Sequence, residues 1–415
     1  MNTRFFAPAV LAGAALAMAT QTHAESRDLR SFNPAISVIL DGLYYHDSEH
    51  GEGMELLEEH ASALHSHSHD HDHGHGHGEL GQGFNLRELE LTLSGAVDSY
   101  FDASVTAALA EGDVEIEEAW FQTRSLPGGL TLKGGKFLSA MGYHNEKHVH
   151  SWDFADQNLA YLSLFGDHGL RDTGIQLSWL APTTTFVQLG AELLQGSELE
   201  RFGSELDADE AFEAWLDEGY GNPPADEDDL GLPERKGPRL ATGFVRIAPD
   251  LGTRQALQLG LSYARHQSQQ AFHVEENPPA PVEAFITEGS ADVLGIQAVY
   301  KRFATGAHGK GSIGVQAEAF ATSSDQVATY HSDPLELGIP VEVSQKAAYV
   351  QGTWGFAPRW QLGLRHAVTG VDSELVEDGA RETLSHSSQN SVALTWLATE
   401  FSRLRLQVNR NNIAT

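Results

Sequence analysis

The chain has 415 residues, no cysteine and a formal net charge of -32, with 58 acidic against 26 basic residues. The acidic excess argues against a nucleic-acid partner, because phosphate contacts need Lys and Arg. Without cysteine there are no disulfides, so the fold itself must supply the stability. After Ala24 no run approaches the roughly 18 consecutive apolar residues that a membrane-spanning helix needs.

The first 24 residues have the features of a secretory signal peptide. Arg4 gives a short basic start, an apolar run rich in Ala and Leu follows, and Thr22-His23-Ala24 offers a cleavage site of small residues. The apolar run is too short for a membrane helix. We expect cleavage after Ala24, which leaves 25–415 as the exported domain.

The rest of the chain alternates between apolar and polar residues. In 83–97, Leu89 and Leu91 point to one face of an extended chain and Glu88 and Glu90 to the other. Gly, Pro and Asp clusters separate the alternating segments. The predicted strands are about 35–45, 83–97, 102–110, 114–124, 130–138, 171–180, 187–193, 239–247, 257–263, 292–303, 313–319, 343–356, 360–368, 383–397 and 402–409.

Short and long connections alternate along the chain. The short ones are DSYF, LPGG, APTT, PDLG, ATGAHGKG, APR and ATEF. This rule predicts an all-β fold, a transmembrane antiparallel up-and-down β-barrel with short periplasmic turns and long outside loops. The apolar face of each strand then meets outer-membrane lipid and the polar face meets water in the lumen. A soluble β-sandwich follows no such rule.

The number of predicted strands, fifteen, is odd, whereas bacterial single-chain barrels have even numbers. The sequence ends on the polar stretch 410–415 rather than on a strand with a terminal aromatic residue. We therefore expect about 16 strands in the complete protein, with the last strand missing from this sequence. The alternative is a strand that is split or overlooked.

By strand number and loop alternation the chain after the signal peptide resembles the sixteen-stranded porins of Gram-negative bacteria, of the general or phosphate-selective type. The resemblance implies a homotrimer in the bacterial outer membrane, with a third outside loop that folds into the lumen and narrows it. Here that loop is 139–169, whose Trp152 and Phe154 suit packing against a wall. The segment has no excess of Lys and Arg, which argues against phosphate selectivity. Another outside loop, 195–238, is strongly acidic.

The first outside loop, 46–82, is rich in histidine. Neutral imidazole binds zinc, copper and nickel. Alternation with Ser, Gly and Asp predicts several overlapping sites of moderate affinity, with Zn²⁺ preferred and Cu²⁺ or Ni²⁺ as alternatives. A polar loop with incidental metal affinity is the other interpretation. The candidate ligands are His60, His65, His67, His69, His71, His73, His75 and His77.

A second histidine group lies in 139–169. His144 and His148 would share a face of a helix, whereas His148 and His150 would share a face of an extended segment. Either arrangement would place imidazoles at the constriction as metal ligands. The alternative is ordinary polar residues bonded to the wall. The isolated histidines at 266, 273, 331 and 386 are expected to be solvated.

Charged residues on the inward face of the strands are candidates for the pore lining. They could tune ion preference or form ion pairs that make the barrel rigid. The predicted pore-lining residues are Glu88, Glu90, Lys133, Glu192, Glu318, Arg365, Arg403 and Arg405.

No catalytic motif of the GxSxG, HExxH, Walker or CxxC type is present, and we expect no enzyme. The first functional hypothesis is a porin that passes small solutes or ions, with a loop that concentrates divalent metal for uptake. The alternative is a barrel that only anchors a metal-binding surface, without transport. A TonB-dependent-type metal receptor would need a plug domain and about 22 strands, and neither is found.

Overall fold

The computed structural model describes residues 34–49, 53, 54, 57, 81–110, 113–197, 199, 201–232, 237–275, 283–377, 379–383 and 385–413. The expected signal peptide and the histidines from 60 to 77 lie outside these residues. None of the helices in the described ranges is long and apolar enough to cross a membrane.

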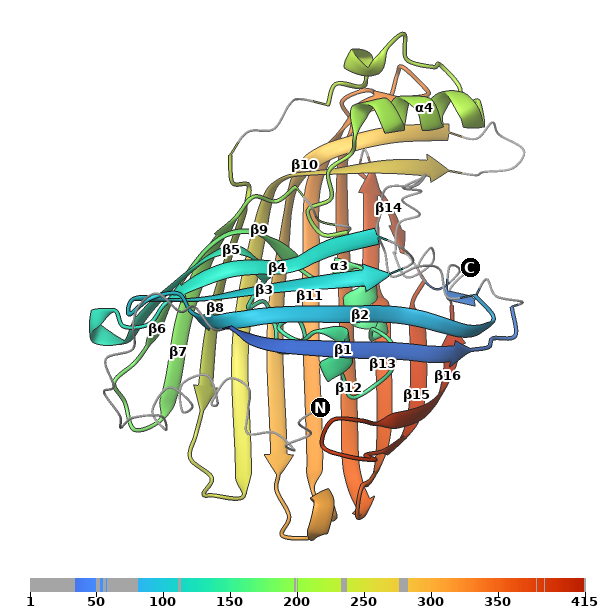
Figure 1. The fold of residues 1–415 in the computed structure, drawn as a ribbon. Coiled ribbons are helices and arrows are strands. Elements are labelled where there is room, and N and C mark those ends of the chain that lie inside the picture. The colour runs from blue at the N-terminus through green and yellow to red at the C-terminus, as the bar shows by residue number, and fades with distance from the viewer. Residues whose placement is uncertain are drawn as a thin grey trace.

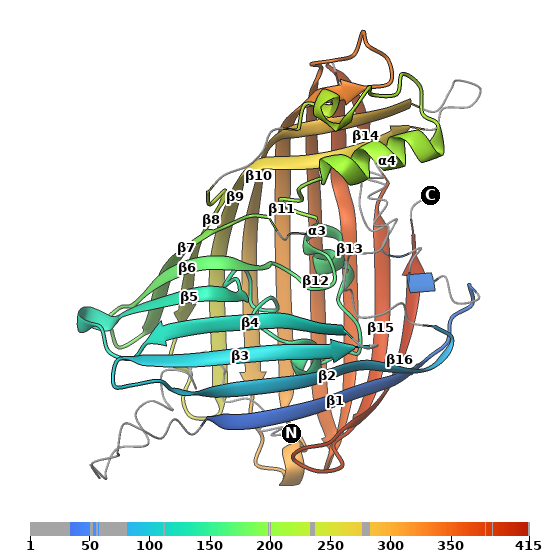
Figure 2. The same ribbon diagram turned by 45° about the horizontal axis from the view of Figure 1, so that its top comes forward.

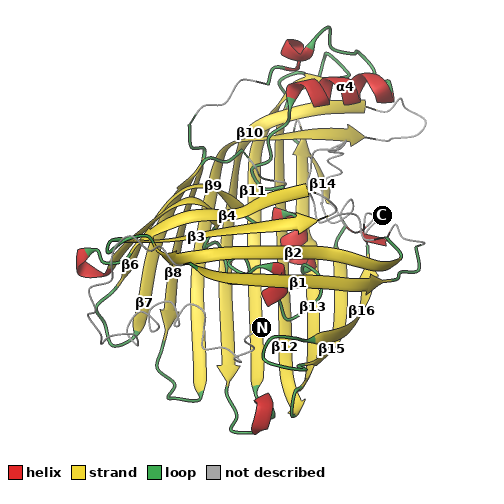
Figure 3. Ribbon diagram, in the orientation of Figure 1, coloured by secondary structure: helices red, strands yellow, loops and turns green. Residues whose placement is uncertain are grey.

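One antiparallel sheet contains all sixteen strands, and each pairs with its neighbour in the chain (Figures 1 and 3). The short strand β14 is the exception to this path, because it pairs only with β13. The strands are β1 (Ala35–Tyr45), β2 (Gly83–Ala96), β3 (Phe101–Ala110), β4 (Asp113–Thr123), β5 (Leu130–Leu138), β6 (Arg171–Leu180), β7 (Phe186–Leu194), β8 (Leu240–Ala248), β9 (Gln255–Glu275), β10 (Glu283–Arg302), β11 (Ile313–His331), β12 (Pro340–Ala357), β13 (Trp360–Glu377), β14 (Ala380–Thr383), β15 (Ser387–Trp396) and β16 (Leu404–Asn412).

The sheet curls around an interior, with β1–β5 in front of β9–β13 (Figures 1 and 2). The two walls cross at a wide angle, as expected for the tilted strands of a barrel. The predicted up-and-down β-barrel is therefore confirmed. The structure has one strand more than the fifteen predicted, the short β14 beside the path of the other fifteen. The expected strand after residue 415 stays a prediction.

The prediction was wrong about the outer ends of β9 to β13, which continue far beyond the predicted strands. Much of the sequence predicted to connect the strands 257–263 and 292–303, and the strands 313–319 and 343–356, is paired strand. β10 pairs with β11 out to His331. In this part exposed residues such as Gln267 are polar. The apolar alternation therefore stops although the backbone ladder continues.

The outer surface carries an apolar band. Leu259 is 46% exposed and Leu406 is 69% exposed, so both leucines point away from the interior. Exposed Trp354, Trp360 and Trp396 lie next to the short turns, and the rings of Trp360 and Trp396 stack 6.2 Å apart. An apolar band with an aromatic girdle is the surface pattern of a transmembrane barrel.

The helices lie in the connections. They are η1 (Pro127–Gly129), η2 (Val149–Ser151), α3 (Leu159–Phe165), α4 (Ala208–Glu218), η3 (Glu227–Leu230) and η4 (Ala307–Gly309). In the acidic loop, the Asp207 side chain accepts hydrogen bonds from the first turn of α4, and Gly219 ends the helix with φ 70°. The buried Trp215 packs this helix onto Phe272 of β9.

Candidate metal and ion site inside the barrel

The segment 139–170, which we call the inner loop, folds into the interior of the barrel. All seven side chains of α3 are buried, and the Asn158 side chain accepts a hydrogen bond from Tyr161 N at 3.1 Å. Tyr161 packs edge-on against Phe320 of β11, with ring centroids 5.2 Å apart. A Cβ at Gly142, where φ is +81°, would come within 2.1 Å of the Tyr161 hydroxyl. The inner loop is thus packed tightly against the far wall.

Two of the predicted inward carboxylates hold the start of the inner loop. Glu318 accepts hydrogen bonds from Tyr143 N at 2.7 Å, from His144 N at 3.0 Å and from the Tyr161 hydroxyl at 3.0 Å. Glu192 accepts one from Ala140 N at 2.9 Å. Backbone N–H groups that would otherwise be buried without partners are satisfied in this way.

Three of the predicted inward arginines hold the rest of the inner loop. Arg365 pairs with Asp156 at 2.6 Å. Arg403 and Arg405 both donate to the carbonyl of Trp152, at 3.1 Å and 2.9 Å. The eighth candidate, Lys133, lies over the ring of Phe137 at 4.6 Å. These four cations face inward as predicted, and their part in ion preference stays a prediction.

Sequence reasoning missed Arg246, which binds the same loop. It donates to the carbonyl of Ala140 at 2.7 Å and pairs with Glu146 at 2.7 Å. Its position two residues after Phe244, on the inward face of β8, was the available signal.

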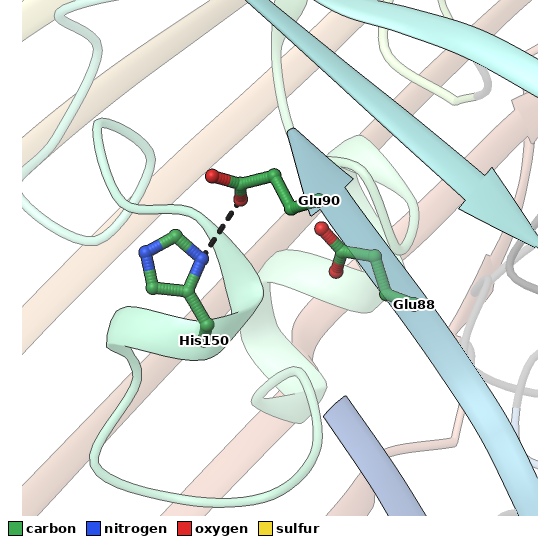
Figure 4. A group of neighbouring side chains, drawn as sticks. All are labelled: Glu88, Glu90 and His150. Carbon is green, nitrogen blue, oxygen red and sulfur yellow. Dashed lines mark ion pairs between the residues drawn. The ribbon is translucent and has the colours of Figure 1, made fainter. Parts of the chain in front are cut away.

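Glu88 and Glu90 behave differently from these anchoring residues. They lie on β2, are buried, and face the 3-10 turn η2 of the inner loop, which carries His150 (Figure 4). His150 Nδ1 lies 2.8 Å from Glu90 Oε2, and His148 Nδ1 lies 3.7 Å from the same oxygen. Glu90 is therefore shared by both imidazoles.

A β-bulge in β4 adds two more carboxylates to this group. The pairing of β3 with β4 shifts between Thr106 and Ala107, which leaves Glu117 as an extra residue. Glu117 and Glu118 consequently both point inward although they are neighbours. His148 Nδ1 lies 3.2 Å from Glu117, and His148 Nε2 lies 3.2 Å from Glu118. Strict alternation could not have placed both carboxylates on one face.

The electrostatics of His148 follow from these contacts. Burial alone would lower the pKa of the imidazole, but the hydrogen bonds and charges of Glu117 and Glu118 outweigh it and raise the pKa to about 10. Without a bound cation, the imidazolium neutralises part of the surrounding negative charge, and a metal ion bound at Nδ1 would replace the proton there.

His144 is not part of this group. Its ring is buried, shares a hydrogen bond of 2.7 Å with the Gln157 side chain, and lies 5.0 Å from the ring of Trp152. Burial lowers the pKa of His144 well below its usual value. His148 is extended, but Val149–Ser151 form the 3-10 turn η2, so neither the helical nor the extended alternative describes the whole segment. The rings of His148 and His150 nevertheless stack, with centroids 5.8 Å apart.

The isolated histidines also differ from expectation. His266, His273 and His331 are buried, whereas His386 is exposed as predicted. The long outer ends of β9 and β11 enclose the three buried rings. His331 lies 3.0 Å from Glu336 and, with Glu377, forms another group with ligand atoms close enough to hold a metal ion.

The antiparallel barrel, its apolar outer band and its inward loop define a porin-type transmembrane β-barrel. No known family profile matches the chain. The chain belongs to the same family as an uncharacterised protein of Aquifex aeolicus strain VF5, with 33% identity over 383 residues, which are 92% of this chain and 74% of that protein.

Comparison of structures finds outer-membrane channels of low sequence identity. The DcaP channel of Acinetobacter baumannii matches over 82% of this chain and 85% of its own, at 10% identity and a TM-score of 0.47. The trimer form of Vibrio cholerae OmpT matches over 79% and 80%, at 12% identity and a TM-score of 0.43.

Proposed function

We propose that the protein is an outer-membrane porin that passes small solutes or ions, with the inner loop narrowing its lumen. The observation that carries the proposal is the combination of an apolar band outside with a charged interior into which the inner loop folds. A solute crossing the lumen would pass between the inner loop and a wall rich in polar side chains.

The space below the inner loop supports this proposal. A cavity near the short turns is lined by Asp153 of the inner loop and by Lys301, Gln316 and Gln351 of the wall. Apolar side chains such as Val299, Ile313 and Val315 line the same cavity. A solute on the periplasmic side would therefore meet a space of mixed polarity up to the inner loop.

The second part of the proposal concerns metal. The His-rich segment 46–82 connects Tyr45, at the end of β1, to Gly83, at the start of β2. In a barrel of this topology that is an outside position. There it would concentrate divalent cations, Zn²⁺ first and Cu²⁺ or Ni²⁺ as alternatives, at the mouth of the lumen. Export by the signal peptide 1–24 and association into homotrimers belong to the same proposal.

Conductance across a planar bilayer tests the channel. We expect stepwise conductance with or without zinc. A barrel that stays closed in both conditions would instead support a surface metal-binding protein without transport. Uptake that requires an energised inner membrane would support a TonB-dependent-type receptor.

Zinc titration tests the metal part. Removing residues 60–78 is expected to lower the number of zinc ions bound per chain and zinc accumulation by cells at low external zinc. Unchanged stoichiometry would contradict the role of the His-rich segment, and conductance would be unaffected by that result.

A further inference from the structure

We propose that Glu88, Glu90, Glu117, His148 and His150 form a binding site inside the barrel for a divalent cation of the zinc class. That ions would pass this site depends on the channel function proposed above. The five residues come from β2, from the bulge of β4, and from η2 and the residue before it, so the folded inner loop brings them together.

The distances suit a metal ion. Ligand atoms of Glu88, Glu90 and His150 all lie within 4.8 Å of one another, as do those of Glu90, Glu117 and His148. The nitrogen–oxygen distances are 2.8 Å for His150 with Glu90 and 3.2 Å for His148 with Glu117. Two ligands of a tetrahedral zinc ion with bonds near 2.0–2.2 Å are roughly 3.3 Å apart. Small side-chain shifts would therefore complete the coordination.

Glu88 provides an independent observation. Its side chain is 2% exposed and, among the described residues, neither carboxylate oxygen has a hydrogen-bond partner. The side chain points toward Glu90 and His150 (Figure 4). A buried carboxylate without partners is costly, and a cation between Glu88 and His150 would supply the missing interaction.

Neighbouring groups orient the imidazoles. Glu118 contacts Nε2 of His148 at 3.2 Å, which directs Nδ1 toward Glu90 and Glu117. Glu118 is itself fixed, since it accepts a hydrogen bond from Leu138 N at 3.0 Å. The carbonyl of His150 accepts a hydrogen bond from Arg403. Such outer contacts fix the ring orientation of metal-binding histidines.

The donor set indicates the class of cation. Three carboxylates and two imidazoles suit zinc and its neighbours in the transition series, whereas calcium and magnesium prefer oxygen ligands alone. Arg171 adds a positive charge 3.7 Å from Glu117.

The site also lies close to the His-rich segment along the chain. Glu88 follows Gly83, the first residue of β2, by five positions, which correspond to roughly 17 Å of strand. A cation released by the His-rich segment would meet Glu88 and Glu90 on the same strand that anchors the segment.

The test separates this site from the His-rich segment while keeping the full chain. His60 and the seven histidines from 65 to 77 are replaced by asparagine, and zinc binding is measured by competition with a chromophoric chelator. We expect one tightly bound zinc ion per chain to remain. Adding Glu88→Gln and His150→Asn should weaken it by roughly tenfold or more, whereas the control pair Glu342→Gln and His308→Asn should not.

Folding of each variant is checked by comparing its electrophoretic mobility before and after heating. If the double variant fails to fold, Glu88→Gln alone is measured. Absence of the tight zinc, or tight zinc unaffected by Glu88→Gln, would overturn the site. X-ray absorption at the zinc edge should show mixed nitrogen and oxygen ligands. Conductance of the same samples separates the two proposals. A chain that conducts without binding zinc would support the channel and contradict the metal site. A chain that binds zinc but does not conduct would support the metal site and contradict the channel.

Discussion

Glu318 joins three segments that are far apart in the sequence. Its carboxylate accepts hydrogen bonds from the backbone of Tyr143 and His144, from the Tyr161 hydroxyl, and from Gln316 beside it on β11. The Tyr349 hydroxyl of β12 donates to it as well. A single buried carboxylate therefore holds both the entry of the inner loop and its helix.

Replacing Glu318 by alanine is expected to release the inner loop. Each buried donor left without a partner costs about 1–3 kcal/mol, so docking should weaken by about 2–5 kcal/mol. Limited proteolysis of the inner loop should become faster, and single-channel conductance should rise or fluctuate more. The exposed Glu342 on β12 provides the control, as Glu342→Ala should change neither readout. Unchanged protease resistance of Glu318→Ala would show that other contacts suffice.

Residue alternation predicted which charges face inward, and Glu88, Glu90, Glu192, Glu318 and Arg365 are indeed buried on that side. It could not predict Glu117 and Glu118 together, because a bulge adds a residue without any sign in the hydrophobic pattern. It also could not separate His144 from His148 and His150. That separation depends on the turn between them and on the aromatic pocket of Trp152 and Tyr161, which are tertiary features.

At the scale of elements, α3 is the part of the inner loop that contacts the far wall. Its packing partners are β12 and β13, and Ser163 of α3 shares a hydrogen bond of 2.6 Å with Thr369 of β13. The aromatic content of 139–169 predicted packing against a wall. The aromatic content could not indicate which wall, because nothing in the sequence of this seven-residue helix specifies its contacts with a distant strand.

A cysteine pair can test this packing, because the native chain contains no cysteine. Ser163→Cys with Thr369→Cys is expected to form a disulfide when the barrel assembles in an oxidising periplasm. The product should migrate faster without reductant. Ser163→Cys with Ser104→Cys, on β3 in the opposite wall, serves as the control pair. Equal cross-linking of both pairs would contradict a fixed position of α3.

The lengths of the strands show which strand boundaries the hydrophobic pattern can predict and which it cannot. Where strands cross the apolar band, as in β1, β5 and β6, the predicted bounds agree with the structure. In β9 the strand runs to Glu275. There the ladder is held by backbone hydrogen bonds with the neighbouring strands, and no alternation of side chains is needed.

At the scale of the whole molecule, the apolar band sets where the barrel meets lipid. Replacing Leu259 of β9 by arginine would place a charge on that band and cost about 2–4 kcal/mol near the bilayer midplane. We expect less folded barrel in the membrane and unfolding at lower urea concentration. Leu335→Arg is the matched control, because Leu335 is 90% exposed in the connection between β11 and β12. Equal stability of the two variants would contradict the lipid-facing assignment.

The charge of the whole chain leads to a prediction about selectivity. With 58 acidic and 26 basic residues, the field at the mouth and in the lumen should favour cations over anions. The inward arginines reduce this bias only in part, because Arg365 and Arg246 are paired with Asp156 and Glu146 of the inner loop. The reversal potential in a tenfold KCl gradient should therefore have the sign of a cation-selective pore. Selectivity should fall between about 0.1 M and 1 M salt, as the screening length shrinks from about 10 Å to about 3 Å.

The contribution of the carboxylates on β2 can be isolated in the same measurement. Glu88→Gln with Glu90→Gln removes two carboxylates from the lumen and should lower cation selectivity, while Glu342→Gln, outside the lumen, should leave it unchanged. If the pore prefers anions, the arginines that anchor the inner loop dominate the field. The acidic surface would then attract cations to the mouth of the pore without favouring their passage through it. Metal binding at the mouth would be a function distinct from transport.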